Sequence, residues 1–212
     1  MSDVFEAIAS AVSQGDESAT VSLVREALEA GVPASEILAR GLTPGMQALG
    51  DLFTDGQAFL PEILISARAM KTGLAELRPL LGNSAAAGRG TVVLGTVEGD
   101  LHDIGKSLVG MLLEGNGFEV IDLGVDVKAD AFIEAVQKHH AGIVALSALL
   151  TTATPQFRRV LDSLGDTGLR DQVKVMVGGA SVSSALADEI GADGFAPDCV
   201  AAVGEAERIL KG

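Results

Sequence analysis

The sequence predicts an α/β protein in which an N-terminal four-helix bundle precedes a doubly wound, parallel, five-stranded sheet. Two observations predict this fold class. Over the first 81 residues the apolar side chains recur every three or four positions, which is the period of an amphipathic helix. After residue 90, short apolar runs alternate with helical patterns. That alternation is typical of parallel strands covered by helices on both faces.

Turn residues divide the helical part of the chain into four expected helices. They stand at Gln14-Gly15-Asp16, Gly31-Val32-Pro33 and Asp55-Gly56-Gln57. Pro61 suits the first turn of the fourth helix, because a first-turn residue needs no backbone N–H. Short loops between such helices indicate a small antiparallel bundle.

The remainder predicts a flavodoxin-like (Rossmann-like) domain. Expected strands are 91–97, 118–123, 142–147, 173–177 and 194–196, and expected helices are 104–115, 129–139, 155–164, 183–190 and a last one ending at 210. The segment from Gly82 to Gly90 is small and nearly uncharged, as linkers are. We therefore predict a helical bundle cap at 1–84, a flexible linker at 85–90 and an α/β domain at 91–212.

Composition excludes several classes of function. The net charge of −14 leaves no basic face for nucleic acid or an anionic membrane, and the absence of Trp and Tyr removes the usual platforms for base stacking. The single Cys199 permits no intramolecular disulfide. The start carries acids where a signal peptide carries positive charge, and no apolar run is long enough to span a bilayer. We expect a cytoplasmic protein with neither nucleic-acid nor membrane partners.

In a doubly wound sheet, ligands bind outside the carboxyl ends of the strands. Polar or glycine-rich loops follow the first, third and fourth expected strands, at 98–107, 147–152 and 178–181. Gly105-Lys106-Ser107 has the ending of a phosphate-binding loop, but Asp100 stands where that motif needs its first glycine. A nucleotide triphosphatase is therefore disfavoured.

His102 is the more informative residue in the first loop. Asp100, two positions earlier, is placed to accept a proton from one ring nitrogen and so to orient the imidazole. Zinc or iron would need three or four ligands, and His139 and His140 fall at the opposite end of a helix. One protein ligand is enough only if the metal arrives inside a macrocycle.

The series Asp100-x-His102-x-x-Gly105, Ser147-x-Leu149 and Gly178-Gly179 resembles the DxHxxG–SxL–GG motif of cobalamin-binding domains in residue type and spacing. The stretch from Gly45 to Glu62, here named the cap segment, is similar to the helical cap that precedes this domain in methionine synthase and in stand-alone corrinoid methyl carriers. Together the two resemblances cover nearly the whole chain.

The resemblance implies cobalamin or a related corrinoid, as methylcobalamin or cob(I)alamin, bound base-off with His102 as the lower axial ligand of cobalt. His102 and its partner Asp100 would be the catalytic pair. The implied cofactor-binding residues are Gly99, Asp100, Leu101, His102, Asp103, Ile104, Gly105, Ser147, Leu149, Thr151, Gly178, Gly179 and Ala180, with Phe53 and Leu60 shielding the upper face. Taken alone, the two glycines also fit an ordinary turn, and Phe53 and Leu60 also fit plain bundle core.

The chain departs from methionine synthase at Ala153, where that enzyme extends the Asp–His pair with a serine. We therefore expect a shorter or rerouted proton relay.

The resemblance implies a methyl carrier, itself not catalytic, within a cobalamin-dependent methyltransferase system. Its partners would be a substrate-specific methyltransferase, a corrinoid:pterin (tetrahydrofolate or similar) or thiol methyltransferase, and a reductive activation protein. The methyl donor would be methanol, a methylamine, a betaine or an aryl methyl ether.

Two alternatives stay open. One is a cobalamin-binding sensor or regulator, which would carry a basic recognition helix and an aromatic upper face. The other is the cobalamin subunit of a mutase, which commonly lacks the cap segment.

Overall fold

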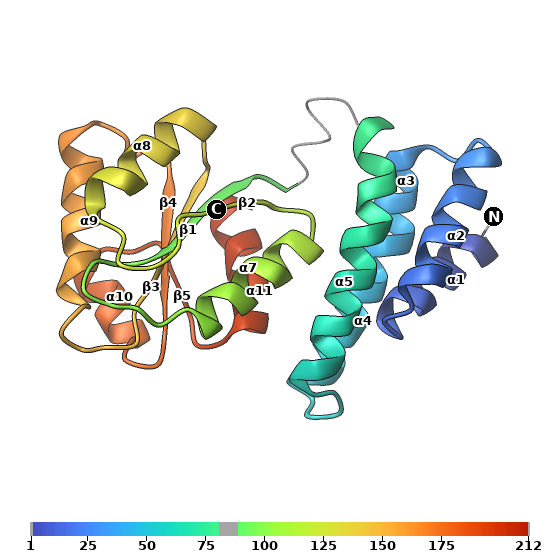
Figure 1. Ribbon diagram of the computed structural model, residues 1–212, viewed down its shortest axis with the longest axis horizontal. Coiled ribbons are helices and arrows are strands. Elements are labelled where there is room, and N and C mark those ends of the chain that lie inside the picture. Colours follow the sequence, from blue (N-terminus) through green and yellow to red (C-terminus); the bar gives the residue numbers. More distant parts are fainter. Residues whose placement is uncertain (1, 81–88, 212) are drawn as a thin grey trace. The chain divides into compact units, whose positions relative to one another are not determined.

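The computed structural model describes residues 2–80 and 89–211 (Figure 1). The chain divides into two compact units, one made of the helices before residue 81, with which residues 114–117 are grouped, and one made of the sheet and its helices. The linker predicted at 85–90 lies mostly outside the described residues. The two units are therefore described one at a time, and the predicted boundaries 1–84 and 91–212 stay predictions.

The helical unit contains the four predicted helices. Its segments are α1 (Ser2–Ser13), α2 (Glu17–Glu29), α3 (Ala34–Ile37), η1 (Leu38–Leu42), α4 (Thr43–Thr54), α5 (Leu60–Leu77) and η2 (Arg78–Leu80). Asp16 caps α2 by accepting a hydrogen bond from the backbone N–H of Ala19 at 2.9 Å. The core side chains of this unit include Ile8, Val12, Val24, Ile37, Leu42, Ile63, Met70 and Leu77. In α4, a Cβ at Gly45 would lie 2.4 Å from the carbonyl oxygen of Ala9, so α1 packs closely against α4.

The predicted third helix is one continuous path of α3, η1 and α4 with a π turn in its middle. Pro44 lies two residues after this turn, in the first turn of α4. Its ring would clash with the carbonyl four residues earlier in a regular α-helix, and it cannot donate a backbone hydrogen bond. The wider turn, in which the N–H of Thr43 donates to the carbonyl of Leu38, relieves that conflict.

The second unit is the predicted doubly wound sheet. Its elements are β1 (Thr91–Thr96), α7 (Ile104–Gly115), β2 (Glu119–Asp122), α8 (Ala129–His139), β3 (Ile143–Ser147), α9 (Pro155–Asp166), β4 (Lys174–Gly178), α10 (Ser184–Ile190), β5 (Gly194–Ala196) and α11 (Cys199–Lys211). All neighbouring strands are parallel, in the order β2-β1-β3-β4-β5. The predicted α/β fold class with a five-stranded parallel sheet is confirmed.

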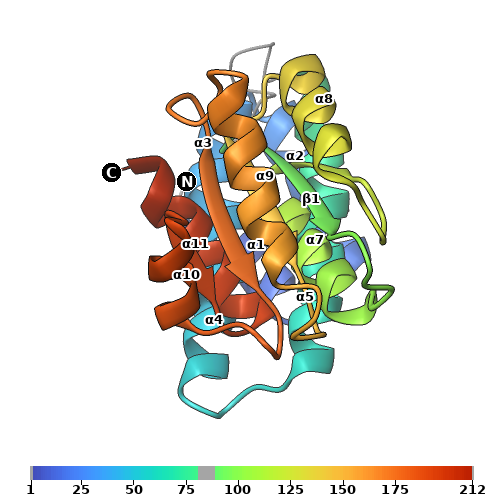
Figure 2. The same ribbon diagram turned by 90° about the vertical axis from the view of Figure 1, so that its left-hand side faces the viewer.

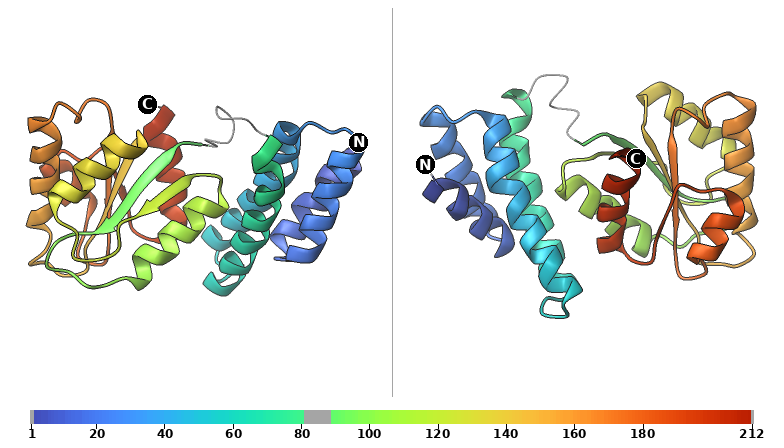
Figure 3. Two further views of the ribbon diagram at one scale, coloured as in Figure 1. Left: turned by 45° about the horizontal axis from the view of Figure 1, so that its top comes forward. Right: turned by 180° about the vertical axis from the view of Figure 1, so that it is seen from behind.

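Helices cover both faces of this sheet. Figure 2 views it from the side of α8, α9 and α10, and Figures 1 and 3 show α7 and α11 on the other side. Alternate residues of a strand point to opposite faces. Thus Val93 and Val144 pack with Phe132 and Phe157, whereas neighbouring residues on the same strands pack with Leu113, Ala206 and Ile209.

The chain reverses direction across the sheet between β1 and β3, since β2 lies outside β1 and β3 lies on its other side. At such a reversal the loops after the two strands diverge and leave room for a ligand. Because the strands are parallel, the loops after β1, β3 and β4, which carry the sequence motifs, all lie at the carboxyl edge of the sheet. In the part of the chain that the structure describes, no helix combines the length and the apolar character needed to cross a membrane.

Candidate functional site

The carboxylate of Asp100 is the centre of the site, and it is fully buried. Its Oδ1 accepts hydrogen bonds from the backbone N–H of His102 at 3.0 Å and from ring nitrogen Nδ1 of His102 at 2.6 Å. Its Oδ2 accepts from the backbone N–H groups of Leu149 at 2.6 Å and Leu150 at 2.9 Å. One carboxylate therefore ties the loop after β1 to the loop after β3.

Burial by itself would raise the pKa of the Asp100 carboxyl group. The hydrogen bonds donated by Leu150, His102 and Leu149 outweigh burial and hold this pKa well below its usual range. Asp100 is therefore ionised at neutral pH, and an ionised acceptor keeps a proton on Nδ1 of His102.

The imidazole of His102 is half exposed, with 51% of its side-chain surface accessible. Because Nδ1 donates to Asp100, the other ring nitrogen, Nε2, keeps its lone pair and is the one available to a metal. The hydroxyl of Thr96 donates to the carbonyl of His102 at 2.8 Å and fixes the backbone of the loop. The histidine is held in one tautomer and one orientation.

Large apolar side chains in, or next to, the two loops that Asp100 joins are not buried. Leu101 is 72% exposed and Ile104 is 82% exposed, and Leu149 and Leu150 in the loop after β3 are also exposed. Exposed apolar clusters of this kind commonly mark a binding surface. The edge of the sheet thus offers a flat apolar ligand both a ligating nitrogen and an apolar seat.

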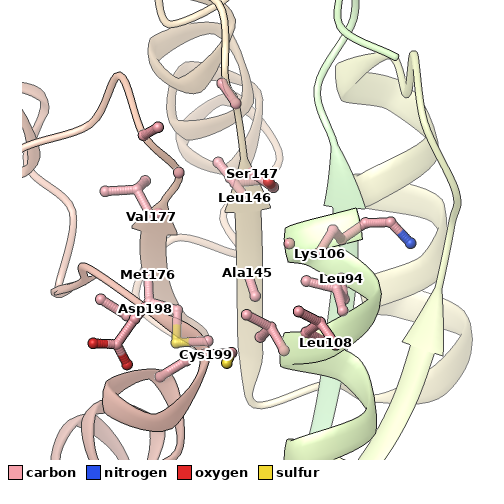
Figure 4. Close-up of a pocket in the computed structure, with 18 of the residues that line it drawn as sticks. Leu94, Lys106, Leu108, Ala145, Leu146, Ser147, Met176, Val177, Asp198 and Cys199 are labelled. Atoms are coloured by element: carbon pink, nitrogen blue, oxygen red, sulfur yellow. The ribbon is translucent and has the colours of Figure 1, made fainter. Parts of the chain in front are cut away.

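A cavity of about 340 Å³ opens beside His102, between the ends of the strands and the helices α7 and α11 (Figure 4). Six of the predicted motif residues line it, together with residues that the sequence did not single out: Gly105, Ser147, Leu149, Gly178, Gly179 and Ala180. No heavy atom lies within 4 Å of the position that a Cβ would take at Gly105. The cavity therefore has room at its entrance for a ligand that passes His102.

At the end of β4, Gly178 and Gly179 lie so close to neighbouring backbone that a larger residue would not fit at either position. A Cβ at Gly179, whose φ is +123°, would lie 2.0 Å from the carbonyl oxygen of Ala148. A Cβ at Gly178 would lie 2.9 Å from the carbonyl oxygen of Ala196. Gly179 therefore lets the loop after β3 approach the end of β4, and Gly178 lets β5 approach it from the other side, with or without a ligand.

Lys106 belongs to the Gly-Lys-Ser run that resembled a phosphate-binding loop. Its side chain is buried, and its ammonium group contacts the carboxylates of Asp103, at 2.9 Å, and of Asp122 at the end of β2. An ammonium group already held by two carboxylates is poorly placed to bind phosphate.

The other predicted residues divide between the two units. Gly99 and Asp103 are exposed in the loop after β1, and Thr151 is exposed in the loop after β3. Phe53 and Leu60 belong to the helical unit, at the end of α4 and the start of α5, where each is half-buried. Their predicted role over the upper face of a cofactor stays a prediction.

Two parts of the site were not predicted from the sequence. The backbone N–H groups of Leu149 and Leu150 carry no residue-type signal, although the following Ala153, which is buried, had indicated that no side-chain hydroxyl extends the pair. The inner wall of the cavity includes Met176 and Ala202, which come from the interiors of a strand and a helix and fit an ordinary core in the sequence. Among the described residues, no group of three His, Cys, Asp or Glu side chains is close enough to hold a metal ion.

Comparison with known proteins decides the family. Models described as "B12 binding domain" match residues 90–210 and residues 4–78. The chain belongs to the B12-binding family. The resemblance that the motifs indicated is therefore confirmed.

Relatives of this B12-binding protein align along nearly all of it. It is 41% identical to corrinoid protein DSY3155 of Desulfitobacterium hafniense, over 94% of each chain. It is also 41% identical to dimethylamine corrinoid protein 1 of Methanosarcina acetivorans, over 98% of each chain.

Solved structures support the same family. A cobalamin-binding protein from Desulfitobacterium hafniense has 33% identity and a TM-score of 0.81, covering 97% of this chain and 98% of that one. The methanol:cobalamin methyltransferase complex of Methanosarcina barkeri contains a chain with 33% identity and a TM-score of 0.85, covering 99% of this chain and 80% of that one.

The site of the B12-binding protein fits a corrinoid on its own geometry. An imidazole nitrogen oriented by a buried carboxylate could serve as the one protein ligand of a metal that a macrocycle already holds. The exposed Leu101 and Ile104 suit the apolar edge of such a ring, and the adjacent cavity suits an appended tail.

Replacing Asp100 by Asn should destabilise the apoprotein by about 2–4 kcal/mol, because the amide NH₂ must face either His102 or the N–H groups of Leu149 and Leu150. The pKa of Asp100 is lower in the folded chain than the unfolded value of about 4. Its stabilisation is therefore full above that pH and is lost progressively as the pH falls from there through the lower pKa of the folded chain.

Urea unfolding of wild type and Asp100→Asn from pH 7 downward measures both effects. We expect the difference in unfolding free energy to shrink below about pH 4. The control Asp171→Asn, at an exposed side chain, should change stability by no more than about 0.5 kcal/mol. A difference that is constant across this pH range would contradict the role assigned to the carboxylate.

Replacing Gly179 by Ala should lower the free energy of unfolding by about 3 kcal/mol, through the unfavourable φ and the clash with the carbonyl of Ala148. The matched control is Gly191→Ala, with φ +77° and no heavy atom within 4 Å, for which strain alone predicts about 1 kcal/mol. Chemical denaturation of the two variants tests the difference. Equal losses would mean that the loops after β3 and β4 do not need this close approach.

Proposed function

We propose that this protein is a corrinoid methyl carrier, which receives a methyl group from one methyltransferase and presents it to another. The observation that carries the proposal is the contact between His102 and the buried Asp100, beside an apolar edge and a cavity of suitable size. The relatives named as dimethylamine, trimethylamine and monomethylamine corrinoid proteins support the same role.

His102 would hold cobalt through Nε2 in place of the cofactor's own base, so that the cofactor is bound base-off. Asp100 would keep the proton on Nδ1 and orient the ring, which strengthens the nitrogen as a ligand. A bound corrinoid supplies a cobalt atom that accepts and donates methyl groups. The chain's part is to bind it, to fix the lower ligand and to keep water away.

The remaining motif residues would contact the cofactor. Gly99, Leu101, Asp103, Ile104 and Gly105 stand beside His102 in the loop after β1 or at the start of α7. We assign Ser147, Leu149 and Thr151, from the end of β3 and its loop, to the corrin edge and the tail, with Gly178, Gly179 and Ala180 opposite them. Phe53 and Leu60 would shield the upper face.

The hydrogen bonds of Asp100 are relevant to the proton relay, because this chain has Ala153 where methionine synthase has a serine. In this chain the second carboxylate oxygen is already engaged by the N–H groups of Leu149 and Leu150. Backbone amides do not give up a proton at physiological pH, whereas a hydroxyl can pass one along. We therefore propose that the relay ends at Asp100 and that Ala153 packs as core.

The proposed partners are a substrate-specific methyltransferase, a corrinoid:pterin or thiol methyltransferase, and a reductive activation protein, in the cytoplasm. Supporting the first of these, a solved relative occurs in a methanol:cobalamin methyltransferase complex. Methylamines and methanol, the compounds in the relatives' names, are the donors to test first.

The lower ligand is tested by electron paramagnetic resonance of the cobalt(II) form after anaerobic reconstitution with cobalamin. We expect splitting by one axial nitrogen in the wild type and its loss in His102→Ala. The control His139→Ala, on α8, should keep the wild-type pattern. A nitrogen splitting that persists in His102→Ala would show that another group is the ligand.

The carrier role is tested by incubating the reduced holoprotein with isotope-labelled methanol or methylamines and the matching methyltransferase. We expect label to become bound to the protein with at least one donor, and His102→Ala to retain less of it, because its corrinoid is held without the proposed lower ligand. A holoprotein that accepts label from none of these pairs would favour a sensor instead.

A further inference from the structure

The cavity beside His102 is apolar over its inner wall. The wall is formed by Leu94, Leu108, Ala145, Met176, Ala196 and Ala202. Figure 4 shows the side chains of Leu94, Leu108, Ala145 and Met176 gathered between the strands and α7. Leu94, Ala145, Met176 and Ala202 are nearly inaccessible to solvent in the described structure.

The polar side chains among the lining residues are His102, Lys106, Ser147, Asp198 and Cys199. The ammonium group of Lys106 is held by Asp103 and Asp122, and in Figure 4 it points away from Met176. Asp198 is exposed, and its Oδ1 accepts the backbone N–H groups of Val200 at 2.9 Å and Ala201 at 2.8 Å. Neither charge is available to a ligand deep in the cavity.

The other three polar groups leave the inner wall equally apolar. His102 and Ser147 lie at the carboxyl edge of the sheet, outside the inner wall. Burial raises the pKa of the Cys199 thiol, so it remains protonated and is a weak hydrogen-bond donor. A ligand that reaches the wall formed by Leu94, Ala145 and Met176 therefore meets no strong hydrogen-bonding side chain.

We propose that this cavity selects among corrinoids by the base at the end of the nucleotide tail, taking an alkyl-substituted benzimidazole in preference to a purine. The proposal rests on the proposed function, since it assumes that the base is detached from cobalt and enters the cavity. It adds the chemical class of cofactor that the site takes.

The physical reason is the loss of hydrogen bonds to water. The ring nitrogens and exocyclic amine of adenine would leave water and meet Met176, Leu94 and Leu108, which offer no replacement. Burying the methyl groups of dimethylbenzimidazole against the same wall makes the free energy of binding more favourable. One unsatisfied polar group is expected to weaken binding about tenfold.

The test compares cobamides that differ in the lower base alone, dimethylbenzimidazole or adenine. The full-length apoprotein is titrated with each, and the dissociation constants are measured from the visible spectrum. Each value is corrected for the cost of detaching that base from cobalt, measured on the free cobamide. We expect the dimethylbenzimidazole form to bind about tenfold more tightly, or better.

Variants make the test independent of that correction. The free energy of detaching each base from cobalt is the same for every protein, so it cancels when the ratio of the two cobamides' dissociation constants is compared between wild type and variant. Met176→Gln places an amide in the inner wall and should reduce the preference about tenfold. Leu108→Gln does the same from α7, at a less buried position that is safer for folding. Met111→Gln, an identical change at an exposed methionine outside the cavity, should leave the ratio unchanged.

Equal corrected affinities, or a ratio that neither cavity variant changes, would overturn the proposal while leaving the methyl-carrier function intact. Failure of both cobamides to bind, or binding with the base still on cobalt, would instead overturn the proposed function and this selection with it. The spectrum distinguishes these outcomes, because detachment of the base changes the visible absorption.

Discussion

The site depends on one buried carboxylate. Asp100 has no exposed surface, yet it stays ionised because four N–H groups from two loops donate to it. The same contacts fix the tautomer of His102 and join the loops after β1 and β3 at the reversal point of the sheet. A single acidic side chain thus sets both the geometry of the edge and the chemistry of the exposed nitrogen.

Much of the fold was predictable because helices cover both faces of the inner strands of the sheet. Strands buried on both faces form continuous apolar runs, so the helices at 104–115 and 129–139 between them were predicted with the bounds that the structure has. The π turn at Leu38–Leu42 was not predicted, since the helical period of apolar residues continues through it. The local cause, Pro44, acts through a clash that periodicity does not detect.

The motif spacing predicted the pair of Asp100 and His102 because both lie in one loop. It could not predict the partners of the second carboxylate oxygen, which are backbone groups 49 and 50 residues away. The contact of Lys106 with Asp122 was missed for the same reason, as it joins α7 to the end of β2. For Gly179 the sequence indicated room for a cofactor tail, whereas the structure also gives a reason within the protein, the approach of the Ala148 carbonyl.

We propose that His102, oriented by Asp100, holds a base-off corrinoid whose tail enters the cavity between the strands and α11. A crystal structure of the cobalamin complex tests this most directly. We expect Nε2 of His102 to be bonded to cobalt, the Nδ1 contact to Asp100 to be kept and the detached base to lie against Met176 and Leu94. Cobalt bonded to the cofactor's own base, or a tail lying outside this cavity, would contradict it.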